Sequence, residues 1–282
     1  MKIMIHAEHP APLAEQLRAA HSDVTILTCS SYEALPGVLA EHRPDIVYSI
    51  RFDGTSDFPT CALLGKHGPR WIAVGGSGVD HLGHWDPDRT TVTNAAGVAA
   101  PMMAEYAFGC FLHFSLDIPG LQKHKSERRW SPRTMFPLRN KTLLLVGLGH
   151  TGRAIARLAK SFGMHVVGTR ATPRPMENVD DVRSADALHE VCGQADMIVV
   201  CSPLLDSTRN LFDEATFAAI KPGAVLVDVS RGGVVQSEAL IQALRTGKLA
   251  GAALDVFDTE PLPEDSPYWD LPNTIISPHC SS

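Results

Sequence analysis

Three residues near the end of the chain have the side-chain types that proton transfer to an organic anion requires. Arg231 lies in Val-Ser-Arg-Gly-Gly, Glu260 in Asp-Thr-Glu-Pro and His279 in Ser-Pro-His. A guanidinium grips a carboxylate through paired donors, an imidazole passes a proton near neutral pH, and a carboxylate orients and charges the imidazole. The spacings of 29 residues (260 − 231) and 19 residues (279 − 260) are too long for one helix face. Only a fold that gathers three chain segments makes them a site.

The elements that must position these residues form a repeating pattern. Short apolar runs alternate with helix-like segments, which is typical of parallel sheets with crossover helices. Most runs are rich in Val, Leu and Ile rather than alternating, as in strands covered on both faces. In the first half we expect strands at 2–5, 24–27, 46–49, 71–74 and 91–93. In the second half we expect them at 142–146, 165–168, 197–200, 224–228, 252–256 and 274–277.

Two stretches have the composition of hinges, at 94–101 and at the polar, Pro-containing 126–140. Pro101 suits the first turn of a helix that runs to about Leu116. At 282 residues the chain exceeds the size at which single cores usually stop growing. We therefore place a domain boundary at the first stretch, which predicts domains of 1–97 and 98–282, and we treat the second stretch as a loop.

Composition excludes several classes of protein. The net charge of −6 argues against a nucleic-acid partner. The N-terminus turns acidic too soon for a signal peptide, and the longest apolar stretch, 106–116, is too short to span a membrane. The six cysteines form no C-x-x-C pair, so we expect buried free thiols in a reducing cytoplasm rather than disulfides or metal ligands.

A glycine-rich loop follows the strand expected at 142–146. It reads Gly147-Leu-Gly149-His150-Thr151-Gly152 and leads into an amphipathic segment. In G-x-G-x-x-G between a strand and a helix, the first glycine permits a tight turn and the second lets the backbone approach a pyrophosphate. The third lets helix and strand pack closely, and the helix N-terminus attracts the anion. The loop therefore predicts a dinucleotide site, rather than a purely structural turn.

The end of the next strand bears on which dinucleotide binds. An acidic residue there would bond the ribose 2′-hydroxyl of NAD. The chain instead has Arg170 and, four residues later, Arg174, while the first acid is Glu177. Arginine suits a 2′-phosphate through its charge and planar donors. We expect NADP(H) in preference to NAD(H), the alternative being that both arginines are solvated loop residues.

From about Trp71 to its end the chain resembles the D-isomer-specific 2-hydroxyacid dehydrogenases, most closely their glyoxylate/hydroxypyruvate reductase branch. The resemblance rests on several motifs in a compatible order: Gly75-Gly-Ser-Gly-Val-Asp80, Met103-Ala-Glu105, the glycine loop, Ser202-Pro203-Leu204, Val229-Ser-Arg-Gly232, Leu254-Asp-Val-Phe257, Glu260-Pro261 and Pro278-His279. It implies an α/β fold of two Rossmann-like domains, a flavodoxin-like substrate domain and a doubly wound dinucleotide-binding domain, with a cleft between them. It also implies reduction of a small 2-oxo acid to the D-2-hydroxy acid by a nicotinamide cofactor.

Residue by residue, the resemblance implies that Arg231 binds the substrate carboxylate and polarises the carbonyl. His279 is then the general acid, with Glu260 as its partner. The other implied substrate contacts are Arg51, Ser77 and Gly78. The implied cofactor contacts are Gly147, Gly149, His150, Thr151, Gly152, Arg170, Arg174, Ser202, Pro203, Ser230 and Asp255.

The chain also departs from the family, since it stops at Ser282, where members usually continue through a C-terminal return helix. That helix is expected to be absent here. A homodimer is expected, as is usual for the family. The alternatives are a nucleotide-sensing corepressor on the same scaffold, a formate dehydrogenase (which has glutamine where Glu260 stands) or another specificity such as phosphoglycerate.

Overall fold

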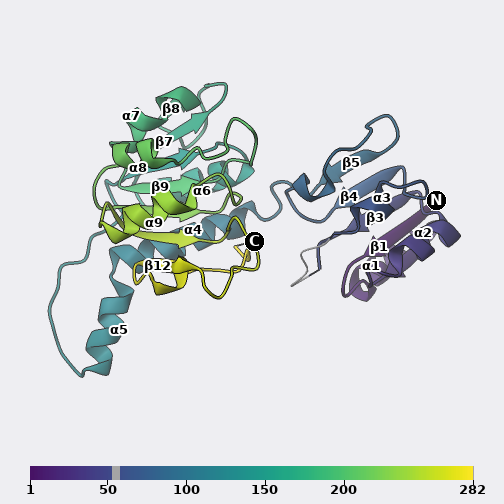
Figure 1. Cartoon of the computed structure of the whole chain (residues 1–282), viewed down its shortest axis with the longest axis horizontal. Coiled ribbons are helices and arrows are strands. Elements are labelled where there is room, and N and C mark those ends of the chain that lie inside the picture. Colours follow the sequence, from purple (N-terminus) through teal and green to yellow (C-terminus); the bar gives the residue numbers. More distant parts are fainter. Residues whose placement is uncertain (53–57, 282) are drawn as a thin grey trace. The chain divides into compact units, whose positions relative to one another are not determined.

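The structure is a computed structural model that describes residues 1–52 and 58–281. The chain divides into two compact units, Met1–Val98 and Ala99–Ser282, and each is described by itself. Figure 1 shows a central sheet with flanking helices in each unit.

The first unit contains a five-stranded parallel sheet in the order β2-β1-β3-β4-β5, which is the flavodoxin-like order. Its strands are β1 (Lys2–His6), β2 (Thr25–Cys29), β3 (Ile46–Ser49), β4 (Trp71–Val74) and β5 (Thr91–Asn94). Its helices are α1 (Ala11–Ala20), α2 (Leu35–His42), α3 (Thr60–Leu63) and the 3₁₀ turn η1 (Asp80–Leu82). Successive β1 side chains enter different clusters, Met4 with Leu35 and Leu39, and Ile5 with Ala14 and Ile26. Both faces are therefore covered, as the unbroken apolar runs predict.

The second unit contains a seven-stranded parallel sheet in the order β12-β11-β10-β9-β6-β7-β8. Its strands are β6 (Thr142–Val146), β7 (His165–Arg170), β8 (Asp181–Ser184), β9 (Met197–Val200), β10 (Ala224–Asp228), β11 (Leu249–Leu254) and β12 (Thr274–Ile276). The chain runs outward from β6 through β7 to β8, and then outward on the other side from β9 to β12. The order reverses between β6 and β9, where doubly wound sheets bind dinucleotides at their carboxyl edge. The predicted fold class is confirmed.

The helices of the second unit pack on both faces of its sheet, apart from one that buries none of its residues. They are α4 (Ala100–Ser115), α5 (Ile118–Ser126), α6 (His150–Ser161), α7 (Leu188–Cys192), α8 (Glu214–Ala219), α9 (Ser237–Arg245) and the 3₁₀ turns η2 (Ala185–Ala187) and η3 (Pro267–Asp270). Leu143 and Leu145 of β6 pack in the cluster that includes α4 and α6. Leu144 and Val146 pack in the other, with α7, α8 and α9. Alternation along β6 thus fixes which helices lie on which side.

The elements differ from expectation at several places. Strand β8 and helix α5 were not predicted, β2 and β7 end two residues later than the expected 24–27 and 165–168, and β11 begins and ends earlier than the expected 252–256. None of the described helices is long and apolar enough to cross a membrane. All six cysteines are free, but Cys61 and Cys280 are exposed, so the expected burial is wrong for these two.

Candidate active site

The three residues with acid–base and anion-binding chemistry follow three neighbouring strands. Strands β10, β11 and β12 lie side by side and run parallel. Arg231 comes after β10, Glu260 after β11 and His279 after β12. Carboxyl ends of parallel strands meet at one edge of a sheet, which is why residues far apart in the chain gather there.

Glu260 and His279 are in direct contact. The Nδ1 of His279 lies 2.9 Å from one carboxylate oxygen of Glu260, and the other oxygen accepts from the backbone N–H of Phe257 at 3.0 Å. Both side chains are partly exposed, at 38% and 30%. An ionised carboxylate only accepts, so the proton of this bond belongs to Nδ1. The opposite ring nitrogen, Nε2, is then the atom that can exchange a proton with a bound molecule.

Arg231 lies in a tight turn that packs against the start of the Glu260 loop. Asp228 accepts from the backbone N–H of Ser230 at 2.9 Å and from its hydroxyl at 2.5 Å. The Arg231 guanidinium donates to the Ser230 carbonyl at 2.7 Å. A side chain at Gly232 would come within 2.0 Å of the Phe257 carbonyl oxygen, so the two backbones touch. The Arg231 turn therefore packs directly against Phe257, whose N–H holds Glu260.

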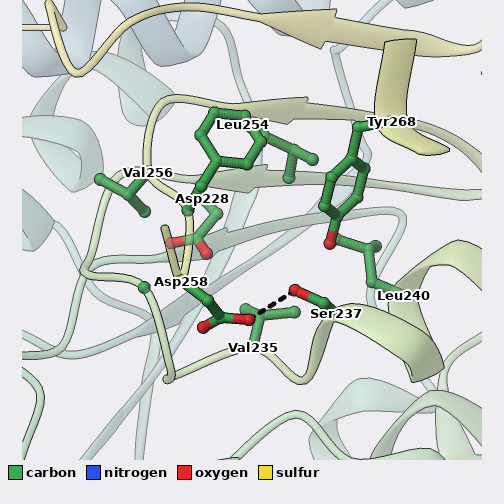
Figure 2. Close-up of a pocket in the computed structure, with 10 residues that line it drawn as sticks. Asp228, Val235, Ser237, Leu240, Leu254, Val256, Asp258 and Tyr268 are labelled. Carbon is green, nitrogen blue, oxygen red and sulfur yellow. Dashed lines mark hydrogen bonds between the residues drawn. The ribbon is translucent and has the colours of Figure 1, made fainter. Parts of the chain in front are cut away.

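A small cavity of about 10 Å³ lies beneath this turn (Figure 2). Asp228, Gly232 and Tyr268 are among the residues that line it, and the Ser237 hydroxyl donates to Asp258 there at 2.6 Å. Its volume suits a water molecule and excludes a substrate. Burial raises the pKa of Asp228 to about 7, and the carboxylates of Asp255 and Asp258 add to the effect. The residues that line this cavity thus pack against the Arg231 turn and support it.

Asp255 holds the segment that carries His279. It is 1% exposed, and its carboxylate accepts from the Ser277 hydroxyl at 2.5 Å, the Cys280 N–H at 2.9 Å and the Ser281 N–H at 3.0 Å. Its predicted contact with the cofactor stays a prediction. The contacts that the structure shows all belong to the chain itself.

The glycine loop joins β6 to α6 as predicted. Gly147 has φ 107°, and a Cβ there would come 2.9 Å from the Ser202 nitrogen. A Cβ at Gly152 would come 2.2 Å from the Gly147 carbonyl oxygen, whereas one at Gly149 would meet nothing within 4 Å. The N-cap of α6 is Gly149, which offers no side-chain acceptor, so the first-turn N–H groups stand uncapped. Open space before an uncapped helix fits a pyrophosphate.

The other residues assigned to the cofactor lie around this loop. Ser202, which follows β9, has a buried hydroxyl with no partner among the described residues, and the Pro203 carbonyl accepts from Thr208 at 2.6 Å. Thr151 donates to the Met103 sulfur at 3.4 Å, and a ring nitrogen of His150 lies 3.2 Å from the Arg153 guanidinium. An unsatisfied hydroxyl at the loop is a polar group suited to a ligand.

Cys201, between β9 and Ser202, is not a nucleophile candidate. Its thiol donates to the Gly147 carbonyl at 3.0 Å, and desolvation raises its pKa to about 12. A thiol of such high pKa stays protonated near neutral pH, so it acts as a small packing group.

Arg170 is the last residue of β7, next to the glycine loop because β6 and β7 are neighbours. Its guanidinium contacts the Met176 sulfur at 3.3 Å, and Arg174 is exposed. No acid occupies this strand end.

The residues assigned to the substrate in the first unit also follow strand ends. Arg51 is exposed after β3, and Ser77 and Gly78 follow β4. The Ser77 carbonyl accepts from the Asn94 amide at 2.6 Å. Their role toward a substrate stays a prediction. Among the described residues no cluster of His, Cys, Asp or Glu could hold a metal ion.

Sequence reasoning assigns no role to three residues of the site region. Asp228, Ser277 and Tyr106 join the networks under Arg231 and His279. A polar residue that ends an apolar strand, as Asp228 does, is a weak signal of such a role. Tyr106 sits in an apolar helix and has no signal in the sequence.

A doubly wound parallel sheet with a glycine-rich loop at the strand-order reversal is typical of dinucleotide-binding proteins. The chain belongs to the D-isomer specific 2-hydroxyacid dehydrogenase family, whose NAD binding domain model matches residues 108–281.

Known proteins agree with this assignment. A D-isomer specific 2-hydroxyacid dehydrogenase family protein from Aeromonas salmonicida is 33% identical, with a TM-score of 0.90 over 100% of this chain and 89% of that one. One from Xanthobacter autotrophicus, solved with NADPH and MES, is 35% identical, with a TM-score of 0.62 over 65% of this chain and 76% of that one. Glyoxylate reductase of Korarchaeum cryptofilum is 33% identical over 68% of this chain and 59% of its own length. Curated relatives match over 40–63% of their length, and their names also include D-3-phosphoglycerate dehydrogenase.

Proposed function

We propose that this protein is an NADPH-preferring reductase that converts a small 2-oxo acid, of the glyoxylate or hydroxypyruvate type, to the D-2-hydroxy acid. The observation that carries the proposal is the 2.9 Å contact between Glu260 and His279, beside the strand end that bears Arg231. A guanidinium for a carboxylate and an imidazole for a carbonyl oxygen match the two functional groups of a 2-oxo acid. The name of the Korarchaeum relative supports the substrate class.

The residues divide the work by chemistry. The nicotinamide cofactor supplies the hydride. Arg231 binds the carboxylate through paired hydrogen bonds and fixes which face of the carbonyl is presented. His279 donates a proton from Nε2 to the carbonyl oxygen, and Glu260 stabilises the charged imidazole before that transfer. Arg51 and the backbone N–H groups at Ser77 and Gly78 are proposed as further contacts with the anion.

The cofactor preference rests on the end of β7. The glycine loop and the uncapped α6 would hold the pyrophosphate, and Arg170 and Arg174 would hold the 2′-phosphate. The nicotinamide half would be held by Ser202, Pro203, Ser230 and Asp255. A side-chain carboxylate at Arg170 would instead repel that group. The Xanthobacter relative, solved with NADPH, supports this preference.

The test is steady-state kinetics of the purified chain with NADPH and NADH against glyoxylate, hydroxypyruvate, pyruvate and phenylpyruvate. We expect turnover of glyoxylate and hydroxypyruvate and a kcat/KM ratio that favours NADPH. Arg170→Asp should reverse the ratio, and Arg157→Asp, at an exposed position of α6, serves as a charge-matched control. If none of the acids is reduced with either cofactor, the proposed function is wrong and a binding role on the same scaffold remains.

We also propose that the protein is a cytoplasmic homodimer. The segment after α5 exposes Trp130 at 96% and Phe136 at 65%, and α5 itself buries none of its residues. Such apolar exposure is typical of a surface that a partner covers. Exposed thiols at Cys61 and Cys280 suit a reducing compartment. Sedimentation should show a dimer for the wild type and a monomer for the double variant Trp130→Ser/Phe136→Ser.

A further inference from the structure

His279 has a backbone conformation that its surroundings must impose. Its φ is 53°, in the left-handed region that residues other than glycine rarely adopt. Its own N–H donates to the Ser277 carbonyl at 3.1 Å, and the Ser277 N–H continues the sheet by donating to Leu254 at 3.0 Å. These bonds fix the chain before His279, and other contacts must fix the chain after it.

Asp255 supplies those contacts from one buried carboxylate. It binds the Ser277 hydroxyl before His279, and the N–H groups of Cys280 and Ser281 after it. Hydrogen bonds to a buried charged group are among the strongest in proteins. The imidazole is therefore mounted on a segment that is held on both sides.

A fourth hydrogen bond ties this clamp to helix α4. The Tyr106 hydroxyl lies 2.8 Å from the Ser277 hydroxyl. Because Ser277 gives its one proton to Asp255, its oxygen accepts and Tyr106 donates. Burial raises the pKa of Tyr106, so it stays a donor throughout the working pH range. The chain of donors runs from Tyr106 through Ser277 to Asp255.

Helix α4 also contacts the dinucleotide loop. Met103 accepts from Thr151 in the first turn of α6, and it lies three residues before Tyr106, on the same face of α4. One helix face therefore touches both the first turn of α6 and the segment that carries His279.

We propose that Tyr106 is a positioning residue for His279, acting through Ser277 and Asp255. The inference rests on the proposed function, in which His279 transfers the proton. Tyr106 contacts neither substrate nor cofactor in this role. The Tyr106 hydroxyl keeps the backbone around His279 in the conformation that orients the imidazole. Glu260 holds the Nδ1 side of the same ring.

The first test is Tyr106→Phe, which removes one oxygen and leaves the ring. We expect kcat to fall about tenfold, with the KM values for the oxo acid and for NADPH within about twofold, because misplacement of an acid slows chemistry more than binding. The matched control is Ser115→Ala, which removes a buried hydroxyl from the same helix α4, one with no hydrogen-bond partner among the described residues, and should leave kcat within about twofold. Equal losses in the two variants, or a rise in KM without loss of kcat, would overturn the proposal.

Ser277 provides the second test. Ser277→Ala should lower kcat by a similar factor, Ser277→Thr should restore most of it, and Tyr106→Phe/Ser277→Ala should be little slower than either single variant, because both break one chain. If the losses of kcat in the two single variants multiply in the double variant, the two hydroxyls act independently. That result would contradict a hydrogen-bond chain from Tyr106 through Ser277 to Asp255. Thermal unfolding of each variant checks that the fold persists.

A spectroscopic readout separates this inference from the proposed function. The His279 ring resonance is assigned by its loss from the spectrum of His279→Gln. Tyr106→Phe should shift or broaden that resonance, whereas Ser115→Ala should not, whether or not any oxo acid is turned over. An unchanged His279 resonance sinks the positioning role, while full activity of His279→Gln sinks the proposed function.

Discussion

Glu260 is a residue at which charge and shape can be separated by one substitution. Glutamine has the same length and can still accept from the Phe257 N–H, but it cannot hold a negative charge beside Nδ1 of His279. Because the charged imidazole loses its partner, Glu260→Gln should lower kcat about 10- to 100-fold with little change in stability. The measurement is kcat with the best oxo acid and NADPH.

Glu264→Gln is the control for this variant. Glu264 is exposed, four residues further along the same loop, and has the same formal charge. If Glu264→Gln slows the reaction as much as Glu260→Gln does, the effect is one of loop charge rather than of contact with His279.

Asp228 should make stability depend on pH. Its pKa is about 7 in the folded protein because burial disfavours the charge, against an ordinary 3.8. Between pH 4 and 7 the unfolded chain releases this proton and the folded chain keeps it, so the free energy of unfolding falls as pH rises. The fall is up to about 1.4 kcal/mol per pH unit for one full proton.

Asp228→Asn should remove this dependence. The amide oxygen can still accept from the Ser230 N–H and hydroxyl, so the variant gains on the wild type as pH rises from 4.5 to 7.5. Urea unfolding at these two pH values measures the difference, with the exposed Asp206→Asn as control. A parallel response of the wild type and Asp228→Asn would show that Asp228 is ionised in the folded protein throughout.

Sequence reasoning selected Arg231, Glu260 and His279 as candidates because their motifs are local and each follows an apolar run, and the structure shows Glu260 and His279 in contact. It did not identify Tyr106 or Ser277, whose contact spans 171 residues of sequence. A hydroxyl in an apolar helix looks like any other half-buried tyrosine until the fold supplies its partner. Long-range polar contacts of this kind are set by tertiary packing, which no local pattern encodes.

At the scale of elements, two glycines of the same loop should have different roles. Gly152 should matter for the packing of α6 against β6, and Gly149 for the approach of the cofactor. Gly152→Ala places a methyl group about 2.2 Å from a backbone oxygen, so α6 must move away from β6. We expect a loss of about 1–3 kcal/mol of stability. Gly149→Ala meets no atom within 4 Å and has an ordinary φ of −77°, so it should leave stability unchanged and weaken NADPH binding.

Thermal melts and fluorescence titration with NADPH distinguish the two glycine variants. The expected pattern is a lower Tm for Gly152→Ala and a higher Kd at normal Tm for Gly149→Ala. Tight NADPH binding by Gly149→Ala would show that the backbone at this position does not approach the pyrophosphate.

Strands buried on both faces were predictable, and polar or peripheral elements were not. The bounds of β6, β9 and β10 agree with the sequence because each is an unbroken apolar run. Strand β8, Asp-Val-Arg-Ser, lies at the sheet edge with every residue only partly buried, and α5 buries none. Such elements lack the periodicity that burial imposes on a sequence.

At the scale of the molecule, one buried group in each unit should contribute to stability in acid, and the two contributions have opposite signs. Asp228 of the second unit contributes more to the free energy of unfolding as the pH falls, because its pKa is raised in the folded protein. His6 of the first unit favours higher pH, because it is fully buried against Ser49 and Phe52 and desolvation lowers its pKa to about 4. Below pH 6.5 His6 becomes protonated in the unfolded chain, whereas it stays neutral in the folded first unit until about pH 4. The free energy of unfolding of that unit therefore falls between pH 6.5 and 4, by up to about 1.4 kcal/mol per unit.

His6→Gln should flatten this acid response whatever its effect on stability at neutral pH, because glutamine does not titrate. Trp130→Phe/Trp269→Phe leaves Trp71 and Trp85, both in the first unit, as reporters of its unfolding. In that background, urea titrations at pH 7.5, 6, 5 and 4.5 give the slope for the parent, for His6→Gln and for the exposed control His9→Gln. The parent and His9→Gln should lose stability below pH 6.5, and His6→Gln should lose much less. Equal slopes in all three proteins would mean that His6 is protonated in the folded unit and that its burial does not exclude the charge.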